Sequence, residues 1–452
     1  MRHLPYGSVR HAARSVIDKH FRSAFVIEFF QRIYCSAECQ KVDWPSHKLT
    51  CGMYCIGIGI TDRVSQGMQG KTDKIELASF YPLLACLVEK SHIHPDKPVH
   101  SALLHQIVNS PNPNCVPVRF LDGWAGKPVI LGEPISSSPG TEEWWPTSIS
   151  PMVRCKLLRR ILREGYVLPI LTAVCIAVLA EIYTTTSGSS AAGNSEQRRA
   201  RLRYKSSPIA DFGIAMGSAE VTDQDKLAYF HLSDGTLLRG QDPDRHYWIY
   251  FTTVRGEEII LDCAMFTFNM CTMVNGTQAY LPQLAPVSSF APAFFRDRVY
   301  RADTPELHAE RKRLSVLRNE AFHQAIIRST EGFSKNDMRV FRKYMEDLSG
   351  KSCTQKDEEL LATYALSNCN VIGAVLEDSR WRKFPPAPEI AIEQDPGESV
   401  GSPDDGSEEW FKYLKRWKKQ KKSGKVGDET LAQAFRSWKQ RWSESRSTSG
   451  RH

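Results

Sequence analysis

Residues 34–51 read YCSAECQKVDWPSHKLTC and hold three cysteines and one histidine at helical spacing. Three residues separate Cys35 from Cys39, and three separate His47 from Cys51, so each pair falls on one face of a helix, one turn apart. Thiolate sulfur and imidazole nitrogen are donors that zinc prefers, and a structural zinc takes four ligands. The spacing therefore predicts a zinc site made from these four residues.

The segment closely resembles the second half of a MYND-type zinc finger, whose signature runs Tyr-Cys-Ser-x-x-Cys-Gln-x-x-Asp-Trp-x-x-His-x3-Cys. Fingers of this family bind two zinc ions through eight ligands in an interleaved order. The resemblance implies that Cys35 and Cys39 bind one ion and that His47 and Cys51 bind the other. Each ion would be completed by a Cys-x2-Cys pair upstream.

MYND fingers are also protein-protein modules that tend to bind proline-rich peptides. By the same resemblance, Gln40 and Trp44 offer an amide and an aromatic wall to such a peptide. An extended proline-rich strand is already ordered before it binds, and it packs well on aromatic side chains. The resemblance thus implies a zinc-binding interaction protein with a protein partner.

No cysteine precedes Cys35, so the two upstream ligand pairs of the family are absent from this sequence. Three explanations stay open. In the first, residues 1–30 stand in place of the true first half because an exon or start codon was assigned wrongly. In the second, the four remaining ligands, or these four with Cys55, hold one zinc. In the third, the finger has lost its metal. A zinc count on the purified protein separates them.

A second arrangement of reactive residues is similar to that of transglutaminase-like cysteine enzymes. His246-x-Trp248 opens a predicted strand and Asp262 ends the next, so adjacent strands can bring the histidine and the aspartate together. A cysteine nucleophile is required, and Cys155 and Cys175 both lie inside predicted helices rather than at a helix N-terminus. The sequence favours a half-buried structural histidine over a catalytic one.

Two further motifs are weaker. The stretch RGEEIILDC at 255–263 shares Gly-Glu-Glu-Ile with SET methyltransferases, but the other motif of that family is missing, and a hairpin turn accounts for the glycine. His92, His94 and His100 share a proline-containing loop, and a surface loop explains them better than a metal site does. The sequence gives no catalytic residue that it supports over a structural role.

The net charge of +8 is concentrated at the C-terminus, where residues 410–452 hold 13 Lys/Arg and three Asp/Glu. Trp410, Leu414 and Trp417 fall on one helical face, and lysine and arginine fill the other faces. Such a tail can bind nucleic acid or an anionic membrane, or it can pack its aromatic face on the body. Packing is favoured, nucleic-acid binding is the alternative, and a membrane partner is not expected.

Apolar periodicity predicts the elements that carry these residues. The strands predicted over 246–254 and 257–263 form a predicted β-hairpin joined by Arg255-Gly256, because glycine supplies a turn conformation closed to other residues. The uncharged stretch 165–180 is shorter than a membrane span needs and is predicted to be a buried core helix. Helices are predicted over 73–90, 99–108, 152–165, 165–180, 304–329, 334–350 and 356–373, and strands over 115–121, 127–133, 246–254 and 257–263.

These elements predict an α+β fold with a helix-rich main domain, a small zinc-finger segment at the N-terminus and a basic helical tail. Twelve cysteines are too few for a disulfide scaffold, and the N-terminus lacks the apolar run of a signal peptide, so the nucleus or cytoplasm is expected. The predicted segments are an atypical N-terminus (1–34), a partial MYND-type finger (35–55), a linker (56–72), an α+β domain (73–385), a disordered linker (386–409) and the tail (410–452).

Overall fold

The computed structural model describes residues 73–109, 116–184, 200–276, 280, 290–297, 306–329, 332–393, 407–427 and 429–449. The finger segment lies outside them. Residues Gly70–His452 form one compact unit. Among the described residues are nine α-helices and fifteen strands in three sheets, so the predicted α+β class is confirmed. The predicted domain boundaries stay predictions.

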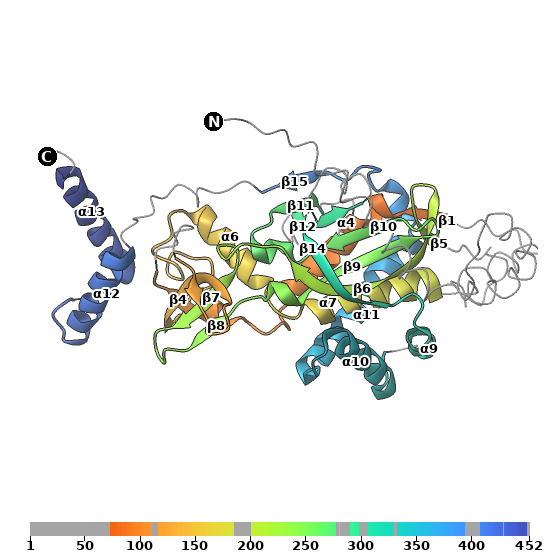
Figure 1. Ribbon diagram of the computed structural model, residues 1–452, viewed down its shortest axis with the longest axis horizontal. Helices are drawn as coiled ribbons and strands as arrows, with labels where there is room; N and C mark the ends of the chain where they lie inside the picture. Colours follow the sequence, from red (N-terminus) through yellow and green to blue (C-terminus); the bar gives the residue numbers. More distant parts are fainter. Residues whose placement is uncertain are drawn as a thin grey trace, which may run out of the picture. The chain divides into compact units, whose positions relative to one another are not determined.

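The central sheet has seven strands: β1 (Asp73–Glu76), β5 (Ala200–Tyr204), β6 (Ser207–Ala219), β9 (His246–Thr253), β10 (Glu258–Asp262), β13 (Phe294–Arg296) and β14 (His308–Ser315). They run in the order β1-β5-β6-β9-β10-β13, and β14 pairs with β6 (Figure 1). Only the pair β1 and β5 is parallel. The sheet therefore gathers strands from four distant parts of the chain.

The hairpin predicted from the sequence is confirmed as β9 and β10. Gly256 has a φ of 76°, a left-handed conformation that favours glycine. The register pairs Ile249 with Leu261, which places alternate residues on opposite faces of the sheet. Ile249 and Leu261 join the main hydrophobic core, whereas Trp248 and Tyr250 form a separate buried cluster.

Strand β14 corrects the prediction of one long helix over 304–329. His308–Ser315 pair with β6, and only Glu320–Arg328 form a helix, α9. The cause lies on β6, where a Cβ on Gly213 or Gly217 would meet a carbonyl oxygen of β14 at 2.1 Å. Glycine at both positions lets β14 approach closely, and this long-range pairing overrides the local helical pattern.

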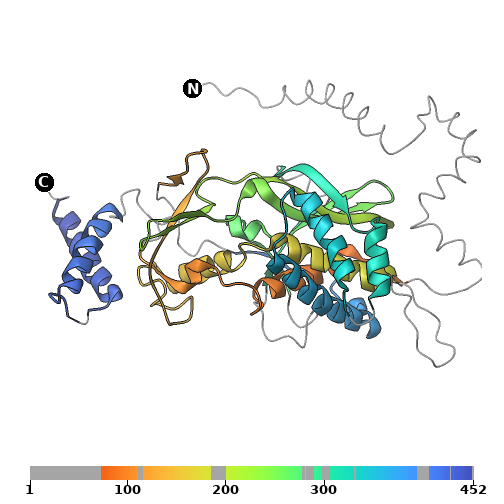
Figure 2. The ribbon, with the colours of Figure 1, turned by 90° about the horizontal axis from the view of Figure 1, so that it is seen from below.

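The helices of the main core are α4 (Leu77–His92), α7 (Val167–Val178) with the π-helical turn η1 (Leu179–Thr184), α9, α10 (Lys335–Ser349) and α11 (Gln355–Glu377). Helix α7 contacts β6 and β9 as well as α4, α10 and α11 (Figures 1 and 2). Every residue of α7 is buried, so the predicted core helix is confirmed. Helix α4 begins at Leu77 rather than at residue 73 because Asp73–Glu76 pair as β1.

Two helical stretches, Val167–Thr184 and Gln355–Glu377, have the length and apolar composition of a membrane span. Most of the first lies buried within the protein, whereas less than half of the second does. A core helix passes the same test of length and composition, and the burial of the first stretch is that of a core helix.

The ends of α10 agree with the sequence. Ser334 accepts a hydrogen bond from the backbone N–H of Asp337, and the Asp337 carboxylate accepts from the Ser334 backbone N–H in return. At the other end Gly350 has a φ of 65°. A capping box and a glycine stop therefore fix both ends of α10, each within one residue of the predicted range 334–350.

A second sheet contains β2 (His105–Ile107), β3 (Val118–Arg119), β4 (Ala125–Pro134), β7 (Leu227–His231) and β8 (Leu237–Arg239), with α5 (Ser101–Leu104) and α6 (Pro151–Leu162). The helix predicted over 99–108 is wrong beyond Leu104, because the chain pairs with β4 there. Ile107 and Val108 enter two different hydrophobic clusters, which agrees with the alternation of extended backbone.

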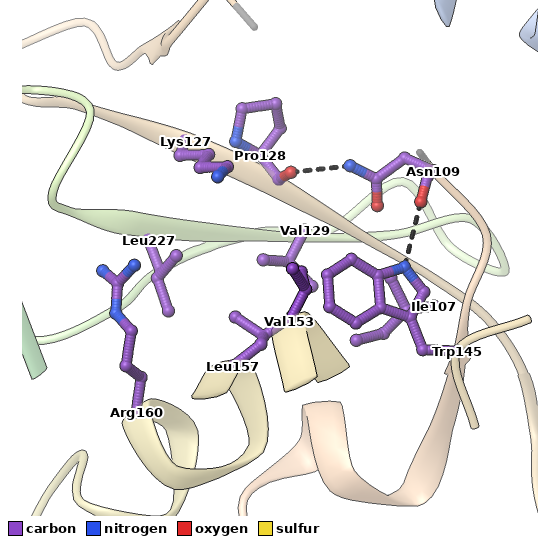
Figure 3. A pocket seen from close by; sticks show the side chains of 10 residues that line it. All are labelled: Ile107, Asn109, Lys127, Pro128, Val129, Trp145, Val153, Leu157, Arg160 and Leu227. Carbon is purple, nitrogen blue, oxygen red and sulfur yellow. Dashed lines mark hydrogen bonds between the residues drawn. The ribbon is translucent and has the colours of Figure 1, made fainter. Parts of the chain in front are cut away.

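A small cavity lies between this sheet and α6 (Figure 3). Its volume is about 20 Å³, which is room for about one water molecule. The polar groups beside it are engaged, since the Asn109 side chain donates to the Pro128 carbonyl and Trp145 Nε1 donates to the Asn109 carbonyl. The cavity is too small and too apolar to be a substrate site.

The remaining elements are β11 (Thr272–Asn275), β12 (Phe290–Pro292) and β15 (Ile390–Ile392) in a third sheet, the short helices η2 (Pro243–Arg245), η3 (Met265–Phe268) and η4 (Arg380–Lys383), and the tail helices α12 (Ser407–Lys422) and α13 (Leu431–Ser449). The disorder predicted over 386–409 is wrong at β15, which pairs with β11. Trp410 and Trp417 of α12 and Phe435 and Trp438 of α13 are buried, and Trp410 Nε1 donates to the Val108 carbonyl at 2.8 Å.

Candidate functional site

Three strands of the central sheet, β9, β10 and β14, bring two histidines and one aspartate together, and β6 lies between β9 and β14. His246 is the first residue of β9, Asp262 is the last of β10, and His308 is the first of β14. The registers place Gly217 opposite His246 and Ala219 opposite His308, so both histidines lie on one face of β6. We call His246, Asp262 and His308 the histidine cluster.

The cluster converges on one carboxylate oxygen. His246 Nε2 donates to Asp262 Oδ2 at 2.5 Å, and His308 Nε2 donates to the same oxygen at 2.7 Å. The other oxygen, Oδ1, accepts from the backbone N–H of Ala264 at 2.8 Å. No side chain of the three is more than 1% exposed. Neither histidine Nδ1 atom has a hydrogen-bond partner among the described residues.

Aromatic rings surround the two imidazoles. The ring of Trp248 lies 4.7 Å from that of His308, and the ring of Phe268 lies 5.6 Å from that of His246. Phe294, which pairs with Asp262 in the sheet, stacks on His308 at 5.9 Å. The rings fix both imidazoles in orientation and exclude water from the carboxylate.

The two imidazoles favour the ionised form of the buried Asp262 carboxyl. Burial alone would raise its pKa, but the charge and hydrogen bond of His246, with the same contributions from His308, outweigh burial and hold the pKa below its usual value. No lysine or arginine in the described part of the chain forms an ion pair with it. The negative charge is therefore balanced only by the imidazoles.

The structure brings His246 and Asp262 together, as the transglutaminase-like interpretation requires, but neither of the two cysteines considered from the sequence is suited to be the nucleophile. Cys155 is exposed on α6. Cys175 is buried within α7, and burial raises the pKa of its thiol far above the usual value. A closed cluster with 1% exposure also gives a substrate no access to His246.

Sequence reasoning missed His308, because residues 304–329 were interpreted as a helix. A signal was present on the partner strand, where Gly213, Ala215 and Gly217 alternate along β6. Small residues at every second position mark a face that another backbone approaches closely.

His92, His94 and His100, which the sequence places in one loop, lie in separate environments. His92 is buried without a hydrogen-bond partner among the described residues. His94 Nδ1 lies 3.8 Å from Asp96 Oδ2, and His100 Nε2 lies 3.7 Å from Glu164 Oε2. Each of the three thus has a different environment.

The predicted finger ligands Cys35, Cys39, His47 and Cys51 and the predicted peptide contacts Gln40 and Trp44 lie outside the described residues. Comparison with protein families tests the segment in another way, because residues 28–51 match the family model described as MYND finger. Residues 28–51 are a MYND finger segment. The chain matches no curated protein and no solved structure. Zinc binding and protein interaction, the general properties of MYND fingers, are thereby supported for this segment.

Four buried charged residues form a second polar cluster, which shares no residue with the histidine cluster. Arg163 forms a bidentate ion pair with Glu89, and Lys97 Nζ donates to the carbonyls of Leu162 (2.5 Å) and Glu164 (2.8 Å). We call Glu89, Lys97, Arg163 and Glu164 the ion-pair cluster. All four are at most 9% exposed.

Proposed function

We propose that this protein is a zinc-binding interaction protein whose MYND finger segment recruits a partner protein. The observation that carries the proposal is the family match over residues 28–51, together with the unbroken spacing of the ligand residues inside it. Zinc-thiolate ligands require reduced cysteines, so we place this function in the nucleus or cytoplasm.

Cys35, Cys39, His47 and Cys51 are the proposed zinc ligands. The matched residues contain four soft donors, which is the number that one structural zinc takes. We therefore propose one ion with three thiolates and one imidazole. The two-ion arrangement of the family would need four more ligands from other parts of the chain.

Metal analysis of two full-length proteins tests this assignment. The wild type is compared with a variant that carries Cys35→Ala, Cys39→Ala, His47→Ala and Cys51→Ala, and zinc is counted per chain in both. We expect the variant to hold about one zinc fewer. A difference of two ions would establish the family arrangement instead, and no difference would refute zinc binding by the finger.

Gln40 and Trp44 are the proposed peptide contacts, and the proposed partner is a proline-rich peptide. Trp44 would provide an aromatic wall for the peptide rings, and Gln40 would provide hydrogen bonds to its carbonyls. We expect Trp44→Ala to weaken binding of a fluorescent proline-rich peptide at least about tenfold in an anisotropy titration. Lys41→Ala, a neighbouring change in the same segment, serves as the control. Equal affinity of the wild type and both variants would refute a proline-rich peptide as the partner.

The tail supports nucleic-acid binding as a second candidate function. Basic side chains on α12 are exposed while its tryptophans are buried, so α12 can contact phosphates but cannot stack on bases through Trp410 or Trp417. We therefore expect binding without sequence preference that weakens steeply with salt. A gel shift compares the tail variant K415Q/R416Q/K419Q with the body variant K335Q/R339Q/K351Q. If both variants bind the nucleic acid equally well, this role is excluded.

A further inference from the structure

The histidine cluster has the donor set of a metal site. Two imidazole nitrogens and one carboxylate oxygen lie within 4.8 Å of one another, and all three residues are buried. Imidazole with carboxylate suits divalent ions such as zinc and ferrous iron. The cluster is distinct from the MYND finger segment, so the inference does not depend on the proposed function.

The orientation of the rings favours a shared ion over separate hydrogen bonds. Both imidazoles direct Nε2 at one oxygen atom, and both leave Nδ1 without a partner among the described residues. When a neutral histidine binds a metal through Nε2, its proton moves to Nδ1. Both Nδ1 atoms can take that proton, so metal binding needs no net loss of protons from the rings.

The surroundings of the cluster give a second reason. Asp262 forms no ion pair with a lysine or arginine among the described residues, in contrast to Glu89, which pairs with Arg163. The three donor atoms instead converge inside a shell of aromatic rings, where one divalent cation can contact all three.

The distances define what must move when an ion enters. Ligand atoms on a tetrahedral zinc are roughly 3.3 Å apart, since each bond is about 2.0–2.1 Å long. The two N···O distances here are 2.5 and 2.7 Å. The carboxylate of Asp262 therefore has to withdraw by less than about 1 Å, which a side-chain rotation provides.

We propose that His246 Nε2, Asp262 Oδ2 and His308 Nε2 are three ligands of a buried divalent transition-metal ion. The ion ties the starts of β9 and β14 to the end of β10. Because all three side chains are sealed from solvent, the ion enters during folding and its binding free energy adds to the free energy of unfolding. Its role is structural.

Metal analysis tests the proposal in a full-length background in which Cys35, Cys39, His47 and Cys51 are replaced by alanine, so that finger zinc does not contribute. We expect about one transition-metal ion per chain in this background. Adding His246→Gln and His308→Gln should remove it. Absence of metal from the background after refolding with excess zinc would overturn the proposal, as would the same metal content in both proteins.

His92→Gln in the same background is the matched control, because His92 is another buried histidine with both ring nitrogens unpaired among the described residues. Its metal content should be unchanged. Near-ultraviolet circular dichroism verifies that each variant folds.

Cobalt replacement gives a second measurement that needs no cluster variant. The alanine background is refolded with Co²⁺, and its visible spectrum is recorded. We expect the ligand-field bands of a low-symmetry nitrogen and oxygen site without thiolate charge-transfer absorption. A thiolate band, or the spectrum of free aqueous cobalt, would contradict the assignment.

The kinetics of metal release distinguish a buried ion from one bound at the surface. A coloured chelator should extract the ion only when urea unfolds the protein, because the ligands are closed to solvent. Rapid extraction from the native protein would overturn the buried site.

Discussion

The ion-pair cluster and the histidine cluster are both buried, but their charges are balanced in different ways. In the ion-pair cluster the Glu89 carboxylate forms a bidentate pair with the Arg163 guanidinium, and Lys97 donates to backbone carbonyls. In the histidine cluster the Asp262 carboxyl faces two imidazoles and no lysine or arginine among the described residues. The first cluster is held by a lysine and an arginine, whereas the basic groups of the second are imidazoles, whose nitrogens can also bind a metal ion.

Breaking the Arg163–Glu89 pair should have the largest effect. Arg163→Met leaves Glu89 buried without its cation, and such a loss destabilises by about 3–5 kcal/mol. Urea unfolding followed by circular dichroism measures it. The double variant Glu89→Leu with Arg163→Met removes both charges and should recover most of the loss; a double variant as unstable as the single one would contradict the role of charge balance.

The titration of Glu164 should give the ion-pair cluster a pH dependence of stability that sharpens its contrast with the histidine cluster. Burial raises the pKa of this carboxyl to about 7, against the opposing effects of Tyr229 and Arg160. The folded state therefore keeps a proton that the unfolded chain releases near its usual pKa of about 4.5. Between pH 4.5 and pH 7 the folded state binds more protons than the unfolded chain, so rising pH lowers the free energy of unfolding. This loss of stability is complete above pH 7.

Comparison with Glu164→Gln separates the titration of Glu164 from that of His100. Burial lowers the pKa of His100 to about 4. The stability of the wild type relative to the variant should fall by up to about 3 kcal/mol as pH rises from 4.5 to 7. Urea midpoints of both proteins across that range measure the difference. Parallel pH profiles would show that Glu164 titrates normally.

Displacement of β14 should disturb the histidine cluster without touching its side chains. A Cβ on Gly217 would lie 2.1 Å from the Ala309 carbonyl oxygen, next to His308. Gly217→Ala should cost about 1–3 kcal/mol and should also lower the metal content of the alanine background. Ser218→Ala, on the opposite face of β6, should change stability by less than about 0.5 kcal/mol and leave the metal in place.

A change outside both clusters provides the smallest effect and a baseline. Ser334→Ala removes the N-cap of α10 and should cost about 1 kcal/mol. Neither the metal content nor the pH profile should change. A change in either would mean that general destabilisation, rather than the two clusters, produces the effects described above.

The sequence predicted those elements whose causes are local. Ser334 and Gly350 mark the ends of α10 within the element itself, and Gly256 marks the β9–β10 turn. The sequence also predicted that His246 and Asp262 lie close together, because the two strands of a hairpin bring nearby residues together. Failures came at residues 99–108 and 304–329, where a helical pattern gave way to pairing with distant strands.

By itself, the sequence determined the MYND finger segment, because its ligands and their spacing lie within 18 consecutive residues. Its local patterns also determined most of the helices and one hairpin. Only the tertiary structure brought His308 to Asp262, 46 residues away in sequence. That contact depends on the close approach of β14 to the glycines of β6, and a side chain's partner across a sheet is decided by strand order and register rather than by the residues beside it.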